Sequence, residues 1–303
     1  MGWISLYSSV GTPTGKNNTR DVKIAQALLN VYLRSINKPA LKITLKINDA
    51  TNQAILDFQK KHMKKIKPDG RIDAGGATYQ ALIEVLKKSF TKKAIVAPTF
   101  GVVTWESEGA EGGYFHSRKL HVPSSASGLT IGRGYDMKEK AKTKVNSDLI
   151  SAGIDTKTIE TLKKSVGLYG ATARQFIIDN DLLDFEITPE AQKKLFKISY
   201  DFQAKEVKRI CDKSGTKKAY GETDWDKLDS NIKDITVDLK FRGDYTPSSR
   251  KFLQKSIVNN DLVEFRKEIV KKSNWTNVPE DRFKRRKRYI EQASSTSSKK
   301  VAA

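Results

Sequence analysis

Two stretches near the middle of the chain decide how the sequence is interpreted. Residues 104–109 read T-W-E-S-E-G, and residues 127–137 read S-G-L-T-I-G-R-G-Y-D-M. Apolar residues in this region do not recur at the spacing of a long helix or a long strand. The Thr-Ile pair, followed by Gly132 and Gly134, instead predicts a short hairpin where a ligand can approach the backbone closely. We therefore expect this region to carry chemistry.

The carboxyl groups of these stretches suit hydrolysis of a glycosidic bond. That reaction needs one carboxylic acid to protonate the leaving oxygen and a second carboxylate to activate water or to attack carbon. Glu108 is the candidate acid, because Trp105 precedes it by three residues and could supply an apolar wall that raises its pKa. Thr130 offers a hydroxyl for ordering water, and Asp136 offers the second carboxylate.

Neighbouring side chains are candidates for other roles. Glu106 and Glu111 flank Glu108 and remain alternatives for the acid. His116 and His121 could act as bases or ligands, although a polar loop contact is the commoner explanation and a two-carboxylate mechanism needs no histidine. The candidate substrate-binding residues are Glu106, Tyr114, Arg133 and Tyr135. Packing beside the hairpin is the alternative for both tyrosines, and an ordinary solvated side chain is the alternative for the arginine.

The motif E-G, then a tyrosine, then S-G-L-T-I-G-R-G-Y-D-M resembles the phage-type lysozyme superfamily. It is most similar to the branch with the C-terminal domain of the bacteriocin pesticin and lysozyme domains of secreted antibacterial effectors. The resemblance spans about residues 99–291 and implies a catalytic trio of Glu108, Thr130 and Asp136. In the shortest phage enzymes the catalytic aspartate lies between the glutamate and the threonine, where this chain has none. Those relatives suggest inversion, which implies carboxyl groups roughly 6.5–9.5 Å apart.

The N-terminal third has the periodicity of three short helices. The apolar pattern predicts helices from about Asp21 to before Pro39, from residue 49 or 51 to about 62 and from 77 to 86, with Thr19 or Asp21 capping the first. A turn at Asp69-Gly70 separates the last two. The segments D-V-K-I-A-Q-A-L-L-N, T-N-Q-A-I-L-D-F-Q-K-K-H and P-D-G-R-I-D resemble the peptidoglycan-binding type 1 family. That resemblance covers about residues 20–88 and implies binding of peptidoglycan.

Composition limits the classes of partner. The chain has 303 residues and a net charge of +21, from 56 Lys and Arg against 35 Asp and Glu. Such an excess predicts attraction to a polyanion. Its lysines are spread along the chain, which weighs against specific reading of nucleic acid. The basic run 284–288 fits a nucleic-acid patch or, as we favour, a solvated helix face. Cys211 is the single cysteine, which excludes a disulfide framework within the chain.

These patterns predict a mainly α protein of α+β class. The N-terminal domain is expected to be a three-helix wall-binding domain, and the second a phage-lysozyme-like domain with a small β-hairpin lobe and a helical lobe. Thr188 and Pro189 are expected to begin a long helix that reaches Cys211. The expected limits are an N-terminal arm with little to bury (1–18), a peptidoglycan-binding domain (19–92), a linker (93–98), the lysozyme-like domain (99–291) and a disordered tail (292–303).

The function predicted from these observations is that of a muramidase, either an antibacterial effector or an endolysin. Peptidoglycan is the expected partner, with no metal or organic cofactor, no specific nucleic acid and no membrane span. An effector would also need a secretion apparatus and a periplasmic immunity protein. We expect synthesis in the cytoplasm without a signal peptide and action in the periplasm or on the wall of a target bacterium. A non-catalytic wall-binding protein and a basic nucleic-acid-binding protein remain the alternatives.

Overall fold

The computed structural model of the chain describes residues 4–12, 14–90, 95–112 and 116–301. It is mainly helical with two small antiparallel sheets, which confirms the predicted mainly α, α+β class. The chain forms two compact units. Unit 1 comprises Met1–Ile95 and Ala110–Leu195, and unit 2 comprises Val96–Gly109 and Phe196–Ala303. Part of the predicted linker, residues 93 and 94, lies outside the described residues.

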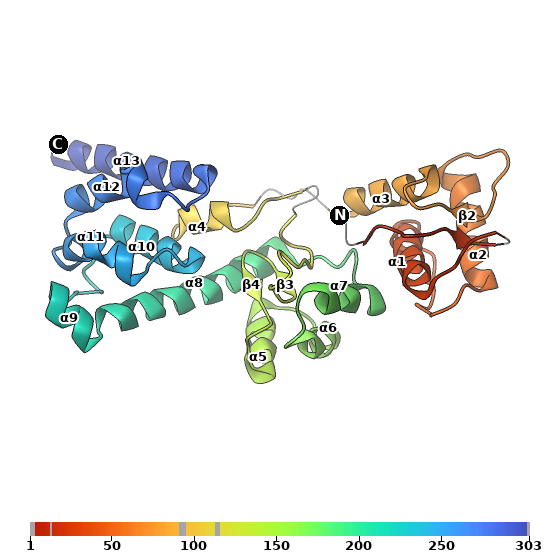
Figure 1. The fold of residues 1–303 in the computed structure, drawn as a ribbon, viewed down its shortest axis with the longest axis horizontal. Helices are drawn as coiled ribbons and strands as arrows, with labels where there is room; N and C mark the ends of the chain where they lie inside the picture. Colours follow the sequence, from red (N-terminus) through yellow and green to blue (C-terminus); the bar gives the residue numbers. More distant parts are fainter. Residues whose placement is uncertain (1–3, 13, 91–94, 113–115, 302–303) are drawn as a thin grey trace. The chain divides into compact units, whose positions relative to one another are not determined.

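The first part of unit 1 contains the three helices expected from the apolar periodicity (Figure 1). Its elements are β1 (Val10–Gly11), α1 (Thr19–Ser35), α2 (Asp49–Asp57) with a π-helical continuation (Phe58–His62), β2 (Arg71–Ile72) and α3 (Ala77–Ser89). Strand β1 pairs antiparallel with β2, with Val10 opposite Ile72. These short elements close one small apolar core.

The N-terminal arm is packed into this core, contrary to the prediction that it buries little. Ile4, Leu6 and Val10 are each at most 5 % exposed. The fully buried Asp21 side chain holds the arm by accepting the backbone N–H groups of Tyr7 and Ser8. Because Asp21 is used in this way, α1 is capped by another residue, Asn18, whose side chain accepts the Asp21 N–H. The predicted caps were therefore wrong.

The second part of unit 1 surrounds a hairpin with short helices. It contains β3 (Thr130–Ile131), β4 (Tyr135–Asp136), α5 (Lys142–Ala152), α6 (Thr156–Leu162), a 3₁₀ turn (Lys163–Ser165), α7 (Gly170–Asp179) and the first residues of α8 (Pro189–Cys211). Ion pairs connect α1 to the segment that follows α7, because Arg34 lies 2.6 Å from both Asp181 and Asp184. Thr188 caps α8 as predicted, accepting the Ala191 N–H at 3.1 Å.

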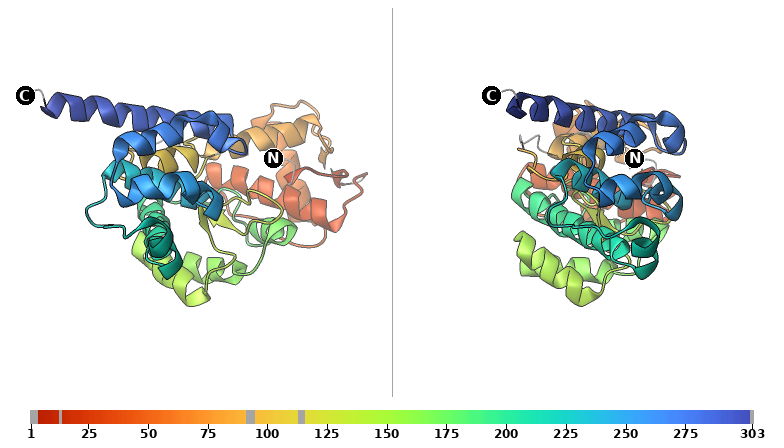
Figure 2. Two further views of the ribbon diagram at one scale, coloured as in Figure 1. Left: turned by 60° about the vertical axis from the view of Figure 1, so that its left-hand side comes forward. Right: turned by 90° about the vertical axis from the view of Figure 1, so that its left-hand side faces the viewer.

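Unit 2 is a group of packed helices (Figure 2). It contains α4 (Val102–Ser107), the rest of α8, α9 (Ser214–Tyr220), α10 (Ser230–Arg242), α11 (Pro247–Val258), α12 (Leu262–Val270), a 3₁₀ turn (Lys272–Trp275) and α13 (Glu280–Val301). Helix α10 contacts α4, α12 and α13. Its residues Ile232, Ile235 and Leu239 are fully buried. Helix α13 includes residues beyond 292, where the sequence predicts a disordered tail.

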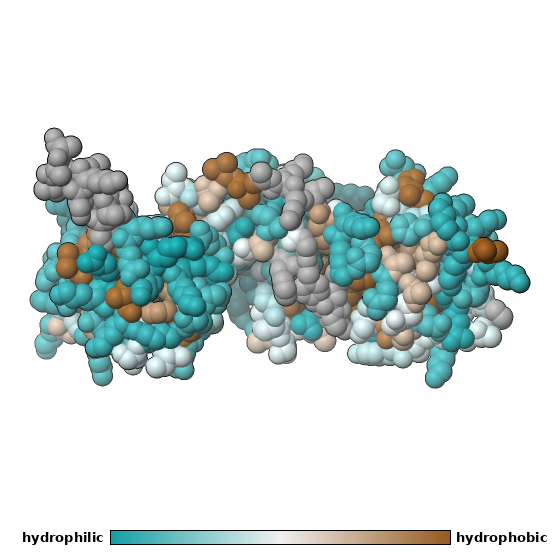
Figure 3. Space-filling view, turned by 90° about the horizontal axis from the view of Figure 1, so that it is seen from above, coloured by the Kyte–Doolittle hydropathy of each residue, from teal (hydrophilic) through white to brown (hydrophobic). Residues whose placement is uncertain are grey.

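Apolar side chains on the surface are dispersed. Figure 3 shows small, separate hydrophobic groups on a mainly hydrophilic face. Scattered exposure of this kind is normal for folded proteins and does not by itself mark an interface. Across the described part of the chain, no helix combines the length and apolar character needed to cross a membrane.

A buried glutamine organises the turn between α2 and α3. Gln59 is fully buried, and its amide nitrogen donates to Asp69, to the Arg71 carbonyl and to Thr78. Its amide oxygen accepts the N–H groups of Asp69 and Gly70, each at 3.0 Å. The side chain therefore supplies hydrogen bonds to a turn whose backbone has no regular partner strand there.

We expect Gln59→Leu to lower the free energy of unfolding by about 2–4 kcal/mol, because it leaves several buried donors and acceptors unsatisfied at about 1–3 kcal/mol each. Amide hydrogen exchange at Asp69 and Gly70 should accelerate more than exchange within α1. Gln53→Leu, at an exposed position of α2, is the matched control and should change stability by less than about 0.5 kcal/mol. Equal effects of the two changes would contradict this role.

Candidate active site

Glu108 immediately follows α4, a helix of six residues. The preceding Val103, Thr104 and Trp105 are buried, with Trp105 packed edge-on against Phe196 at 5.1 Å between ring centroids. The apolar residues hold the short helix in place, and the Glu108 side chain remains 21 % exposed. The carboxyl group is thus largely removed from water but accessible.

Two aspartates one turn apart on α10 bind the N-terminal half of α4. Asp234 accepts the Gly101 N–H at 2.9 Å, and Asp238 accepts the Thr104 hydroxyl at 3.0 Å. Gly101 has a φ of +60°, and a Cβ there would collide with the Tyr200 ring. A glycine is therefore required where the chain enters α4.

Arg282 connects Glu108 to this buried charge network. Its guanidinium donates to Glu108 Oε1 at 2.7 Å and to Asp238 Oδ1 at 2.7 Å. Asp238 also accepts from Arg286 Nε at 2.6 Å. Asp238 is fully buried, Arg286 is 1 % exposed and Arg282 is 8 % exposed. A carboxylate with two arginines satisfies the requirement that buried charges be paired and hydrogen-bonded.

The environment moves the pKa values of these two carboxyl groups in opposite directions. Burial raises the pKa of Glu108, and the positive charge of Arg282 offsets only part of that effect. Burial also acts to raise the pKa of Asp238, but Arg286 and Arg282 outweigh it, so that this pKa is lowered. Carboxyl groups with separated pKa values suit different roles, one as a proton donor and the other as a fixed charge.

The two alternative acids have different surroundings. Glu106 is exposed and pairs with Arg288 at 2.9 Å. Glu111 belongs to an ion network of unit 1, where it pairs with Arg118 and accepts from Gln192 at 2.7 Å. Among these three glutamates, Glu108 combines low exposure with a raised pKa. Its properties are those expected of a general acid.

Thr130 and Asp136 lie opposite each other in the hairpin β3–β4. Gly132 and Gly134 have φ values of +63° and +81° in the connecting turn, which explains the glycines of the T-I-G-R-G sequence. Asp136 accepts the N–H groups of Gly128 at 3.0 Å and Lys138 at 2.8 Å, one on each carboxylate oxygen. The structure thus brings these two predicted residues together and fixes the aspartate.

The predicted substrate contacts at Tyr135 and Arg133 receive no support from their burial. Tyr135 is fully buried and donates its hydroxyl to Asp148 at 2.9 Å. Arg133 is 4 % exposed and lies 3.2 Å from Glu111. The burial of Tyr135 agrees with the packing alternative for this tyrosine, whereas Arg133 is not the solvated side chain of its alternative. Tyr114 lies outside the described residues.

The histidines make local polar contacts. His116 is 1 % exposed; its Nδ1 accepts the Gly112 N–H at 2.7 Å, so Nε2 carries the proton toward Glu186 at 2.9 Å. His121 Nδ1 lies 3.0 Å from the Lys119 carbonyl, and burial lowers the pKa of His121. In the parts of the chain that the structure describes, no group of three His, Cys, Asp or Glu side chains is placed to hold a metal ion.

Three residues of interest were missed from the sequence. Two of them, Arg282 and Arg286, recur at i and i+4 on α13 and both pair with Asp238, and this spacing on one helix face was the available signal. Arg286 is buried, so the solvated helix face predicted for residues 284–288 was wrong at this position. The third missed residue, Tyr169, is 55 % exposed, and no sequence pattern distinguishes it from the other tyrosines.

Tyr169 lies beside the segment that holds Asp136. Its backbone forms an antiparallel bridge with Gly128, the residue whose N–H binds Asp136. The Lys138 ammonium lies 5.1 Å from the centre of the Tyr169 ring. An exposed aromatic face is therefore fixed near Asp136 and Thr130, all within unit 1. Glu108 belongs to unit 2.

Comparison with known proteins assigns the chain to a family. The model of a domain of unknown function, DUF8812, matches residues 101–287, which is more than half of the sequence. The chain therefore belongs to the DUF8812 family. A search of curated proteins found no match. The family match includes Glu108, Thr130, Asp136 and Arg282, and its description names no activity.

We expect ionisation of Glu108 to destabilise the folded state. Because its folded pKa is raised, the folded state binds more protons than the unfolded state above the ordinary value of 4.5, so stability must fall as pH rises toward the folded pKa. In Glu108→Gln this loss should be absent, and the unfolding curves of wild type and variant should diverge from pH 4 upward. Glu106→Gln is the control. Parallel pH profiles for wild type and Glu108→Gln would refute a raised pKa.

Proposed function

We propose that this protein is a muramidase that hydrolyses the β-1,4 bond between N-acetylmuramic acid and N-acetylglucosamine in peptidoglycan. In this proposal residues 99–291 form a phage-lysozyme-like catalytic domain, and residues 19–92 form a peptidoglycan-binding domain. The observation that carries the proposal is the environment of the Glu108 carboxyl group. It is a largely buried carboxyl group with a raised pKa, and it occupies the position that the lysozyme-like motif assigns to the acid.

Glu108 would act as the general acid. A raised pKa keeps a larger fraction of the carboxyl group protonated near neutral pH, so that it can donate a proton to the leaving glycosidic oxygen. Once the proton has left, the Arg282 guanidinium at 2.7 Å would stabilise the carboxylate that forms. Arg282 would therefore be a positioning residue, itself held by Asp238.

Thr130 and Asp136 would position the attacking water. Each carboxylate oxygen of Asp136 accepts one backbone N–H, which leaves further lone pairs for a water proton. The Thr130 hydroxyl donates to the Gly128 carbonyl at 3.2 Å, so its oxygen can accept from the same water. Attack by a water held in this way would invert the anomeric carbon.

In this proposal the N-terminal domain and the net charge both favour association with the cell wall. A peptidoglycan-binding domain tethered to the catalytic domain would raise the local concentration of glycan without any new contact at the catalytic residues. The net charge of +21 favours association with the anionic wall. The muramidase would be an antibacterial effector or an endolysin that acts in the periplasm or on the wall, and as an effector it would have a cognate immunity protein.

We expect Glu108→Gln to reduce release of soluble muropeptides from purified peptidoglycan by about 100- to 10,000-fold, because the amide cannot donate the proton. Mass spectrometry of the products should show new reducing muramic acid ends for the wild type. Glu106→Gln removes a neighbouring carboxylate that is exposed and paired with Arg288, and it should retain nearly full activity.

The same experiment separates the alternatives. Wild-type protein that sediments with the wall but releases no fragments would overturn the catalytic proposal in favour of a wall-binding protein. Steeply salt-dependent DNA binding with a definite site size, together with no release of fragments, would favour a nucleic-acid-binding protein. A Glu108→Gln variant with full activity would show that another residue is the acid.

Tyr169 is expected to contribute to binding of the glycan. Aromatic rings stack on apolar faces, and such contacts contribute about 0.5–1.5 kcal/mol beyond burial, so Tyr169→Ala should lower kcat/KM about two- to tenfold. Tyr169→Phe keeps the ring and should retain activity. Since the side chain is exposed, neither change should alter thermal stability. A loss of activity in both variants would contradict stacking.

A further inference from the structure

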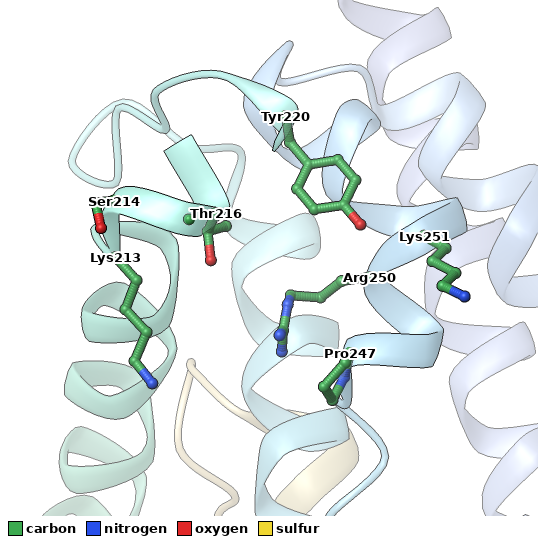
Figure 4. Close-up of a pocket in the computed structure, with 8 residues that line it drawn as sticks. Lys213, Ser214, Thr216, Tyr220, Pro247, Arg250 and Lys251 are labelled. Carbon is green, nitrogen blue, oxygen red and sulfur yellow. The ribbon is translucent and has the colours of Figure 1, made fainter. Parts of the chain in front are cut away.

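A pocket in unit 2 has no part in the proposed hydrolysis. Its volume is about 550 Å³, and its walls come from α9, the start of α11 and the residue before α9. Figure 4 shows the residues that line it: Lys213, Ser214, Gly215, Thr216, Tyr220, Pro247, Arg250 and Lys251. Three of them carry a positive charge, three carry a hydroxyl group, and none carries a carboxylate.

The positive charges of the pocket lack a carboxylate within salt-bridge distance among the described residues. Within the described ranges Lys213, Arg250 and Lys251 form no salt bridge, whereas Arg118, Arg282 and Arg286 are each paired with carboxylates. Arg250 is half-buried, and its guanidinium carbon lies 5.5 Å from the centre of the Tyr245 ring. That contact holds the side chain while leaving its N–H groups unused.

Thr216 provides an independent observation. It is 8 % exposed, and its hydroxyl group forms no hydrogen bond with any residue in the described part of the chain. Figure 4 shows this hydroxyl directed toward the space beside the Arg250 guanidinium. The hydroxyl group opens into the pocket, where it can donate to or accept from a ligand. A hydroxyl group beside an arginine that forms no salt bridge is placed to bind a ligand oxygen.

Arginine and hydroxyl donors with no neighbouring carboxylate favour an anion with several oxygens. Arginine recognises phosphate through two parallel N–H donors, and Lys213 and Lys251 flank it at the edges of the pocket (Figure 4). A monocarboxylate would balance only one of the three charges, whereas a phosphate monoester carries close to two negative charges at neutral pH. The volume exceeds that of one phosphate ion, so part of the esterified molecule would also fit.

We propose that this pocket binds the phosphate group of a phosphate monoester. The site is independent of the muramidase proposal, because it uses none of the residues assigned to hydrolysis. Phosphate could reach it in a small molecule or in a lipid headgroup. Inorganic phosphate and glycerol 3-phosphate test the first source, and phosphatidic acid in phosphatidylcholine vesicles tests the second.

Titration of the isotope-labelled full-length protein, followed by amide NMR shifts at Thr216 and Arg250, tests the proposal. Glycerol 3-phosphate and inorganic phosphate should cause saturable shifts at these residues, and acetate at the same concentration should not. Arg250→Ala should weaken binding about tenfold, and Thr216→Val should weaken it about threefold while keeping the buried shape.

Lys255→Ala is the matched control. Lys255 is exposed one turn beyond Lys251 on α11 and does not line the pocket, so its loss should weaken binding less than twofold. Three outcomes would overturn the proposal: no saturable shifts with either phosphate ligand or with the vesicles, equal binding of acetate, or an effect of Lys255→Ala as large as that of Arg250→Ala. Shifts at Thr216 and Arg250 with vesicles as well as glycerol 3-phosphate would support it and add the lipid source.

Discussion

The buried carboxylate of Asp238 is the constraint on which unit 2 depends. An unpaired carboxylate at full burial costs several kcal/mol, so its partners cannot be removed without loss of stability. Those partners come from two helices that contact α10: Thr104 from α4, and Arg282 and Arg286 from α13. A helix as short as α4 is unstable by itself. The position of α4 is therefore set in part by the hydrogen bond that Thr104 donates to Asp238.

This arrangement explains why Glu108 has unusual properties. Arg282 divides its donors between Asp238 and Glu108. The fully buried aspartate is held as an anion by two arginines, whereas Glu108 accepts a hydrogen bond from one, so that burial dominates its pKa. The two carboxyl groups share Arg282 but differ in pKa, because only Asp238 also accepts from Arg286.

The sequence predicted local features better than distant contacts. Glycine positions identified the β3–β4 turn, because a positive φ is a property of single residues. Apolar spacing identified α1, α2 and α3, and Thr188 identified the start of α8. The pairing of Glu108 with Arg282, by contrast, joins residues 174 positions apart, which no local pattern specifies.

Burial was the least predictable property of the candidate site. Tyr135 and Arg133 occupy a motif typical of a binding loop, but Tyr135 is buried where it begins β4 and Arg133 is buried in the turn before it. Within unit 1, the residues that resemble a wall-binding family, Gln26 and Gln59, are likewise buried donors and acceptors that shape turns. A motif can therefore be specific to a family because its side chains build the scaffold.

The basic side chains of the chain fall into two groups with different electrostatic effects. Arginines such as Arg118, Arg282 and Arg286 are buried and neutralised by carboxylates, so they contribute little to the field outside the protein. The excess positive charge consequently belongs to side chains without acidic partners, and these attract polyanions without distinguishing among them. Selectivity requires a fixed geometry. Arg250 has one, because the Tyr245 ring holds its guanidinium in a pocket that the Thr216 hydroxyl also lines, whereas an exposed lysine on the same helix has only its charge.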